Sequence, residues 1–497
     1  MHRPFVFIGA GALIASFALI KNVWLAVLLL ILAASLTIVL STNKRNFINK
    51  GVIIALIFII LIFRFISLSL FIEVNNENLV GIKTDVTAEI IDIGYNSPSF
   101  SSITVKIKDS SEASAKGLKV TSTLRHKTEA LPGDIIKASV VFSEMQNNYK
   151  FLNFGKGIFF SGEIEKIYSY ERKNVSFYRI IYNVRSQITK SIENAGRDDA
   201  GAVLKALIIG DDSGISKDLD QKVRSSGVSH MLVVSGMHLG ILCTVAMNII
   251  NGKTKRFVAV TSGIVISLFI LAVCLFHVSI LRASIAYIVM LLAKLFKRNS
   301  DPLSALGFGI AVAVFFMPYI FYNVAFLLSV AATFAVLYPA RLLIMAVGFE
   351  SFGRVGRVLR YAYDILIITA ATLFCTLPIV SYYFGYVALA APLTNLAVTL
   401  AMNIALIVGA LAVILSFLPF GKFISIPFYF ISRLCIKYFV FAVEQIGKND
   451  FGVVFINDDK NIYCFLITIA FILLVKIFSK PLILKREEKL RAQRQNT

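Results

Sequence analysis

The sequence predicts a polytopic α-helical membrane protein of about twelve spans, with one small extracytoplasmic β-rich, OB-like domain. Hydrophobic residues make up 57% of the 497 residues and charged residues only 16%, whereas a soluble globular chain has roughly 25% charged residues. Apolar windows of about 17–25 residues, long enough to cross a bilayer as a helix, recur along the chain. These observations favour an integral membrane protein over a soluble one.

The apolar windows form two groups, one on each side of the hydrophilic region. The expected spans are residues 5–20, 22–40, 51–72, 229–250, 257–276, 278–296, 302–317, 320–340, 363–381, 392–416, 423–446 and 461–479. The first window is short, and 278–296 and 302–317 could be partly re-entrant. No convincing small-residue cleavage site follows the first window, so we expect a retained helix and not a signal peptide.

This pattern predicts five parts of the chain. We expect three transmembrane helices in 1–72, the extracytoplasmic β-rich domain in 73–170, amphipathic connecting helices in 171–227, a transmembrane channel domain in 228–479 and a basic cytoplasmic tail in 480–497. The five cysteines all fall in apolar stretches. No disulfide is therefore expected in the hydrophilic domain.

Basic residues in the short loops predict the orientation of the spans. The net charge is +21, yet residues 74–178 hold 13 Lys+Arg against 12 Asp+Glu, so this hydrophilic region is nearly neutral. With twelve spans, all the basic loops fall on one side, which is the cytoplasmic side by the positive-inside rule. These loops carry Lys44, Arg45, Lys50, Lys253, Lys255, Arg256, Lys297, Arg298, Arg354, Arg357 and Arg360. We therefore expect both termini in the cytoplasm and the hydrophilic domain outside.

Alternating apolar and polar residues predict strands in the hydrophilic domain. The alternation is clear in residues 84–92, 102–108 and 135–142, and turn residues lie at 96–99 and 132–134. About four to six short strands in a domain of this size fit a small barrel such as an OB-fold. A nearly neutral barrel fits a scaffold or partner surface as well as a strand-binding groove.

Residues 177–195 have the spacing of an amphipathic helix. Its expected apolar positions are Phe177, Ile180, Ile181, Val184 and Ile188, and its expected polar positions include Arg179, Arg185 and Lys190. Such a helix lies on the membrane surface or packs on the helical bundle.

The stretch 227–240 places polar side chains in an apolar window. These are His230, Ser235 and His238, and polar groups in hydrocarbon usually mark a wet path or a site. The two histidines are eight residues apart, so on an unbroken helix they would point about 80° apart, unlike the i, i+4 pair of a zinc helix. Gly236 and Gly240 could break the helix and re-aim them.

Two enzymatic alternatives remain open for this stretch. Asp211 and Asp212 could add oxygen ligands to a metal, but only if their loop folds onto it; otherwise they form a solvated turn before a helix capped by Ser216. Ser235 lacks the G-x-S-x-G elbow of serine hydrolases. Ser235 and Gly236 also fit close packing between helices.

Further charges fall within expected spans. They are Arg64, Arg282, Arg433, Lys437 and Glu444. Arg433, Lys437 and Glu444 share one helical face, which could line an aqueous path or pair with charges on another helix. Arg282 is expected close to the outer surface, where its side chain could snorkel to water.

The ordered set of motifs resembles the signature of the ComEC family of bacterial competence proteins. The first block comprises Gly210-Asp211, Gly227, His230, Ser235-Gly236 and His238. The later blocks are Ser279-Ile-Leu-Arg282-Ala283, Phe326-Leu-Leu-Ser329, Pro378, Phe384 and Asn395-Leu396. The N-terminal spans and the β-rich domain also look like the family's N-terminal region.

The sequence departs from the family pattern at several positions. Val278 and Leu400 stand where the family often has proline, and Asp212 stands where it often has a basic residue. Many members continue into a metallo-β-lactamase-like domain, whose H-x-H-x-D-H ligand set is missing here. The five histidines are His2, His126, His230, His238 and His277. We expect a short form in which any nuclease of that type is a separate protein.

The resemblance implies a channel in the bacterial inner membrane that passes single-stranded DNA into the cytoplasm during transformation. Its lining or gate would comprise His230, Ser235, His238, Arg282 and Asn395, with Asp211 and Asp212 at the entrance. Gly210, Gly227, Gly236 and Ser329 complete the signature.

No enzymatic activity, cofactor or metal is expected of this channel. A cytoplasmic motor is required because no G-x-x-x-x-G-K-[ST] loop is present. The expected partners are single-stranded DNA, the lipid bilayer, a DNA receptor, that motor and a separate nuclease, and a homodimer is left open. The rival hypotheses are a transporter of another solute on the same fold and a membrane-embedded metal- or serine-dependent hydrolase.

Overall fold

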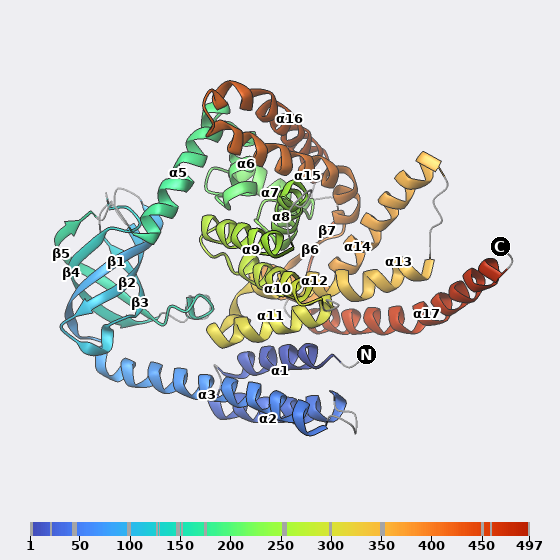
Figure 1. The fold of residues 1–497 in the computed structure, drawn as a ribbon. Helices are drawn as coiled ribbons and strands as arrows, with labels where there is room; N and C mark the ends of the chain where they lie inside the picture. Colours follow the sequence, from blue (N-terminus) through green and yellow to red (C-terminus); the bar gives the residue numbers. More distant parts are fainter. Residues whose placement is uncertain are drawn as a thin grey trace. The chain divides into compact units, whose positions relative to one another are not determined.

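The protein is mostly helical and contains one closed β-barrel (Figure 1). The computed structural model describes residues 3–19, 22–41, 47–96, 101–125, 128, 130–145, 150, 153–172, 176–250, 256–297, 301–347, 353–448, 452–457 and 460–495. Several residues used above lie outside these ranges, namely His2, Lys44, Arg45, 97–99, His126, Lys253, Lys255 and Arg298. The chain forms two compact units, Met1–Gln187 with Gly307–Asn323, and Ile188–Leu306 with Val324–Thr497.

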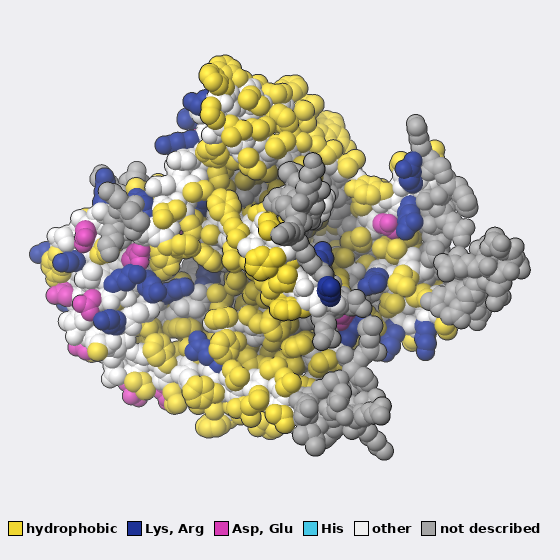
Figure 2. Space-filling view, in the orientation of Figure 1, with side chains coloured by type: hydrophobic (Ala, Val, Ile, Leu, Met, Phe, Trp, Pro, Cys, Tyr) yellow, Lys and Arg dark blue, Asp and Glu magenta, His cyan; other side chains and the backbone are white. Residues whose placement is uncertain are grey.

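Seven described helices are long and apolar enough to cross a membrane. They cover Val52–Leu79, Val278–Leu295, Val324–Ala346, Val355–Phe384, Ala391–Ser416, Gly421–Gly447 and Asn461–Leu484. The five remaining expected spans coincide with shorter apolar helices at Pro4–Leu19, Val23–Ile38, Gly236–Asn248, Phe257–Val273 and Pro302–Phe316. The helical membrane class is confirmed, while the total of twelve spans and their orientation stay predictions. Figure 2 shows hydrophobic side chains over much of the visible helical surface and charges of both signs over the barrel.

The first unit contains helices α1 (Pro4–Leu19), α2 (Val23–Ser41), α3 (Phe47–Leu79) and α11 (Pro302–Phe316), and the barrel. Helices α1 and α11 cross closely, because a Cβ on Gly9 would lie only 2.5 Å from the carbonyl oxygen of Gly307. Arg64 of α3 donates from Nε to the carbonyl oxygen of Phe315, 3.1 Å away, near the end of α11. Carbonyl groups at a helix C-terminus lack intrahelical donors, so this contact accounts for one intramembrane charge.

Five strands close the barrel. They are β1 (Lys83–Asn96), β2 (Ser101–Ser110), β3 (Lys119–Leu124), β4 (Ile135–Glu144) and β5 (Phe160–Glu171), in the order β1-β2-β3-β5-β4 with β1 also paired to β4. Only the β3–β5 pair is parallel. Side chains alternate on β2, where Ile103, Val105 and Ile107 point into the core. The expected strands and the OB-like barrel are confirmed.

Helix α3 is longer than the span expected at 51–72. It continues through polar residues to Leu79, whose side chain is fully buried in the barrel core. The polar composition of its last two turns hid this extension from a hydropathy pattern, because those turns are solvated on one side.

Helix α5 (Phe177–Ala195) is the amphipathic helix predicted, and Ile181 and Ile188 of its expected apolar face are buried, but the rest of that face differs from the expectation. Phe177 and Ile180 are exposed, whereas Arg179 is buried and forms an ion pair with Asp134 of the turn before β4. A buried charge needs an ionic partner, and the pattern of apolar residues alone could not show that the barrel supplies one.

The second unit holds the remaining helices. They are α6 (Asp199–Ile209), α7 (Lys217–Ser225), α8 (Gly236–Ile250), α9 (Arg256–Val273), α10 (Val278–Leu295), α12 (Val324–Ala335), α13 (Arg341–Val347), α14 (Gly353–Phe384), α15 (Ala391–Ser416), α16 (Gly421–Gly447) and α17 (Asn461–Gln495). A π-helical turn joins α12 to α13, and a two-stranded ribbon pairs β6 (Tyr386–Ala388) with β7 (Val453–Phe455). Helices α15 and α16 form an antiparallel hairpin, in which Ser432 Oγ donates to the carbonyl oxygen of Ala405 at 2.9 Å.

Candidate functional site

The segment that the sequence singled out is not one continuous helix. Residues Ser229–Met231 form a 3-10 turn, and α8 begins only at Gly236, so the span expected at 229–250 is broken before Ser235. Gly227 precedes this turn with φ +77°, and a Cβ there would lie 2.6 Å from the Cβ of Ala391. The turn therefore packs against the start of α15 where only glycine fits.

The start of α8 is organised by Ser235 and His238. His238 Nδ1 accepts a hydrogen bond from the Ser235 main-chain N–H at 3.1 Å, and the Ser235 carbonyl accepts from Leu239 N–H at 3.2 Å. This arrangement resembles a capping box, with an imidazole in the place of the usual Glu or Gln. His238 is 3% exposed, whereas His230 is exposed on its turn. The helix break places the two histidines on different elements, the 3-10 turn and α8, where they remain close enough to interact electrostatically.

Arg282 of α10 is buried inside the bundle. Its side chain is 5% exposed, and its Nε and Nη2 donate to Ser329 Oγ of α12 at 3.1 and 2.8 Å. No ion pair of Arg282 with a carboxylate is found in the described ranges. The expectation that Arg282 snorkels to the outer surface is wrong, because α8 and α12 cover it.

The three sequence blocks around these residues meet in space. A Cβ on Gly236 would lie 3.0 Å from Ala283 Cβ and 3.2 Å from Arg282 Nη2, so α8 starts directly against α10. One turn earlier on α10, Ser279 Oγ donates to the carbonyl oxygen of Ala325 at 3.1 Å. The segments 235–238, 279–283 and 326–329 therefore form one polar cluster in the bundle.

The Gly210-Asp211 pair lies at the C-terminus of α6. Gly210 ends that helix in the left-handed conformation, with φ +70°, and a Cβ there would lie 3.2 Å from Val234 Cγ2. Asp211 Oδ1 accepts from the N–H and hydroxyl of Ser213 at 3.2 and 2.6 Å, and Asp212 is exposed. The glycine thus packs against the signature segment while the aspartates follow in a turn. Ser216 caps α7, as predicted.

Asn395 lies one helical turn after Ala391 on α15, and Ala391 is the residue against which Gly227 packs. It is 6% exposed, and its Oδ1 has no hydrogen-bond partner among the described residues. Unpartnered buried polar atoms are uncommon in folded proteins, so this oxygen is a candidate ligand-facing group. No hydrogen bond or ion pair among the described residues joins Asn395 to the cluster around Arg282.

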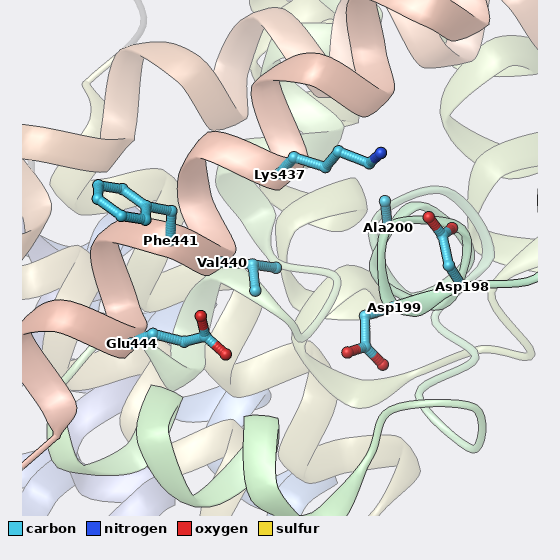
Figure 3. A pocket seen from close by; sticks show the side chains of 7 residues that line it. All are labelled: Asp198, Asp199, Ala200, Lys437, Val440, Phe441 and Glu444. Carbon is cyan, nitrogen blue, oxygen red and sulfur yellow. The ribbon is translucent and has the colours of Figure 1, made fainter.

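The charged face of α16 pairs with neighbouring helices. Arg433 Nη2 donates to Asp198 Oδ2 at 2.7 Å, and Lys222 Nζ lies 3.5 Å from Glu444 Oε1. Lys437 lines a pocket of about 270 Å³ between α16 and the start of α6 (Figure 3). Its lining residues are Asp198, Asp199, Ala200, Lys437, Val440, Phe441 and Glu444. The sequence had left open whether this face lines an aqueous path or pairs with charges on another helix. Pairing is confirmed for Arg433 and Glu444.

The sequence-based search missed Asp198. Its carboxylate caps α6 by accepting from Gly201 N–H at 3.1 Å. Burial alone would raise the pKa of Asp198, but the Gly201 hydrogen bond and the Arg433 charge outweigh burial, so the pKa falls below its ordinary value. The available signal was an Asp directly before an apolar helical run.

Within the described ranges, no group of three or more His, Cys, Asp or Glu residues could hold a metal ion. His238 Nδ1 accepts from the main chain of Ser235, and no hydrogen bond between it and the Ser235 hydroxyl is found in the described part of the chain. The absence of metal, cofactor and enzymatic activity stays a prediction.

The fold and the cluster define an integral helical membrane protein with an OB-like barrel and a buried Arg–Ser–His–Gly site. Residues 207–481 match the family described as Competence protein, and this match covers more than half of the chain. The chain belongs to this family. The matched range contains every signature residue from Gly210 to Asn395.

One curated relative is ComE operon protein 3 of Bacillus subtilis (strain 168). The chain is 22% identical to it over 305 residues, which are 61% of this chain and 37% of the relative. The chain therefore matches little more than a third of that protein's length. No solved structure matches the chain.

Proposed function

We propose that this protein is the inner-membrane channel of a competence machinery and passes single-stranded DNA into the cytoplasm during transformation. The observation that carries the proposal is Arg282, a buried cation in the bundle whose polar contacts are to a neutral hydroxyl. An ionisable residue inside a membrane bundle usually marks a path for a charged substrate. DNA carries one negative charge per nucleotide, so its passage requires donors that offset phosphate charge.

The other residues of the cluster have supporting roles in this proposal. His230, Ser235 and His238 lie at the broken start of α8 and supply polar groups beside Arg282, and Asn395 offers an amide on α15. Asp211 and Asp212 lie in the turn after α6 and position the entrance. Ser235 has no catalytic role here, which the use of His238 Nδ1 by the main chain supports.

The orientation and the partners follow from the same proposal. Both termini lie in the cytoplasm and the barrel lies outside, as the basic loops indicate. A receptor delivers the DNA on the outer side, a separate nuclease degrades one strand, and a cytoplasmic motor pulls the other. The barrel serves as a scaffold or a partner surface.

A transformation assay tests the proposal. The gene is deleted in a transformable host and replaced by wild type, Arg282→Ala, His238→Ala or Arg197→Gln. Arg197 is the matched control because its side chain is 80% exposed. We expect the deletion and Arg282→Ala to lower transformation by at least about tenfold, since one buried charge is worth several kcal/mol, and Arg197→Gln to have no effect.

Two measurements accompany this assay. Immunoblots of membranes establish that each variant is present at wild-type level. Uptake of labelled DNA into the cytoplasm separates transport from recombination. Normal transformation of the deletion strain would show that the chain is not the channel and would favour a transporter of another solute.

A further inference from the structure

We propose that the guanidinium of Arg282 and the first turn of α8 form a binding subsite for one phosphate group. The identity of the molecule that carries this phosphate rests on the proposed function, because we take the phosphate to be a phosphodiester of the passing DNA strand. The recognition chemistry is that of any singly charged, tetrahedral phosphate.

The guanidinium of Arg282 and the positive N-terminal end of α8 lie next to each other in the absence of an anion. Arg282 carries a full charge at 5% exposure, and a helix N-terminus carries about half a positive charge. A Cβ on Gly236 would lie 3.2 Å from Arg282 Nη2, so the guanidinium lies directly against this helix start. Like charges repel strongly when they are buried, and no ion pair of Arg282 is found in the part of the chain that is described. An anion between them would remove the repulsion.

The same place holds hydrogen-bond donors without acceptors. The first N–H groups of a helix have no intrahelical partner, and the first bond back along α8 is made by Leu239. Because His238 Nδ1 accepts a hydrogen bond from Ser235, its neutral ring carries the proton on Nε2. This Nε2–H has no hydrogen-bond partner among the described residues, although His238 is 3% exposed. An anion at the helix start would accept from it.

Gly236 leaves the helix start open. An added Cβ would lie 3.0 Å from Ala283 Cβ, so any larger residue would crowd α10 at this point. Without that Cβ, the main-chain N–H groups remain accessible to an anion, as in other helix N-termini that bind phosphate. Gly240, one turn later, has nothing within 4 Å of an added Cβ. The two glycines therefore provide a matched pair of variants.

The subsite has one full charge, from Arg282, and otherwise neutral donors. It matches one phosphodiester, with a guanidinium suited to two phosphate oxygens. Conduction requires that binding be favourable enough to enter and weak enough to leave. A single-charge contact on a moving polyanion satisfies both requirements.

The first experiment measures phosphate binding to the full chain in an uncharged detergent. The unfolding temperature is followed with increasing sodium phosphate against sodium chloride at equal ionic strength. Ligand binding to the folded state raises this temperature. We expect Arg282→Gln to need about tenfold more phosphate for the same rise, while Arg197→Gln responds as wild type. Equal responses of wild type and Arg282→Gln would overturn the subsite.

A second pair of variants keeps the test decisive if Arg282→Gln does not fold. Gly236→Ala is expected to weaken the phosphate response, because it blocks the helix start, and Gly240→Ala is expected to leave it unchanged. A phosphate response that Gly236→Ala leaves intact would also overturn the subsite.

The source of the phosphate is tested with two further probes. For a labelled oligothymidine, the slope of log affinity against log salt should fall by about 0.7 in Arg282→Gln, the value for one phosphate of a single strand. Nanodiscs with and without phosphatidylglycerol test a lipid headgroup. Protection by the lipid together with an unchanged oligonucleotide slope would overturn the DNA assignment. Normal transformation of the deletion strain contradicts the channel, whereas a missing phosphate response contradicts the subsite alone.

Discussion

Arg282 donates two hydrogen bonds to the single hydroxyl of Ser329, from Nε at 3.1 Å and from Nη2 at 2.8 Å. These residues are 47 positions apart in the chain and come from α10 and α12. The hydroxyl orients the guanidinium without neutralising it. The cluster thus keeps a buried cation in a fixed position with its charge intact. A carboxylate partner would have neutralised that charge.

Ser329→Ala should destabilise the protein by about 1–3 kcal/mol, because it leaves buried guanidinium donors without an acceptor. Ser329→Thr keeps the hydroxyl and should remain close to wild type. Thermal unfolding in detergent measures both. An alanine variant as stable as wild type would mean that water or another group satisfies Arg282.

Gly236→Ala and Gly240→Ala should have different effects on stability. At Gly236 the new Cβ would lie 3.0 Å from Ala283 Cβ, so Ala283 must give by a few tenths of an ångström, whereas the position at Gly240 is open. Alanine in a helix interior is favoured over glycine by about 0.5–1 kcal/mol. We therefore expect a lower unfolding temperature for Gly236→Ala and an equal or higher one for Gly240→Ala. Similar shifts for both variants would contradict the close approach of α8 and α10.

The buried ion pair of Arg179 and Asp134 should be essential to the seating of α5 on the barrel. Asp134→Ala leaves a buried guanidinium uncompensated, which typically costs about 3–5 kcal/mol. The exposed i, i+4 pair of Arg224 and Asp220 provides the control, and Asp220→Ala should cost no more than about 0.5 kcal/mol. Proteolysis near residue 177 and thermal unfolding report the difference. Equal costs for the two variants would argue against burial of the first pair.

Asp198 should make stability depend on acid pH. Its folded-state pKa lies below the ordinary value of 3.8 because the Gly201 hydrogen bond and Arg433 outweigh the opposing effect of burial. The stabilisation is complete above the unfolded-state pKa and is lost as pH falls through the lowered folded-state pKa. Asp198→Asn should therefore flatten the decline of unfolding temperature below about pH 4. Asp199→Asn, next in the chain, is the control and should retain the wild-type decline.

Thiol labelling in intact cells tests the orientation. Four of the five native cysteines lie in apolar helices and Cys274 lies in the turn after α9; all but Cys435 are buried. A membrane-impermeant maleimide should label Lys116→Cys on the barrel from outside, since its side chain is exposed. Arg360→Cys should be labelled only after the cells are opened, because the start of α14, on which it lies, is expected on the cytoplasmic side. The reverse pattern would invert the proposed topology.

Local patterns were enough to predict many elements. Apolar windows located the helices, alternation located β1, β2 and β4, and Ser216 was expected as a helix cap. Each of these signals is carried by residues close together in the chain, so it can be read without knowledge of the tertiary contacts. The β6–β7 ribbon was not predicted, because strands of three residues give no clear alternation.

The sequence by itself determined the membrane class, the barrel and the order of the signature motifs. Tertiary structure decided which of those residues meet: it broke the segment before α8, buried Arg282 against Ser329, and placed Arg179 on Asp134. These outcomes depend on partners tens of residues away, and the burial of a charge depends on everything packed around it. Periodicity records which face of an element is apolar, but it carries no information about which polar group on another element completes the site.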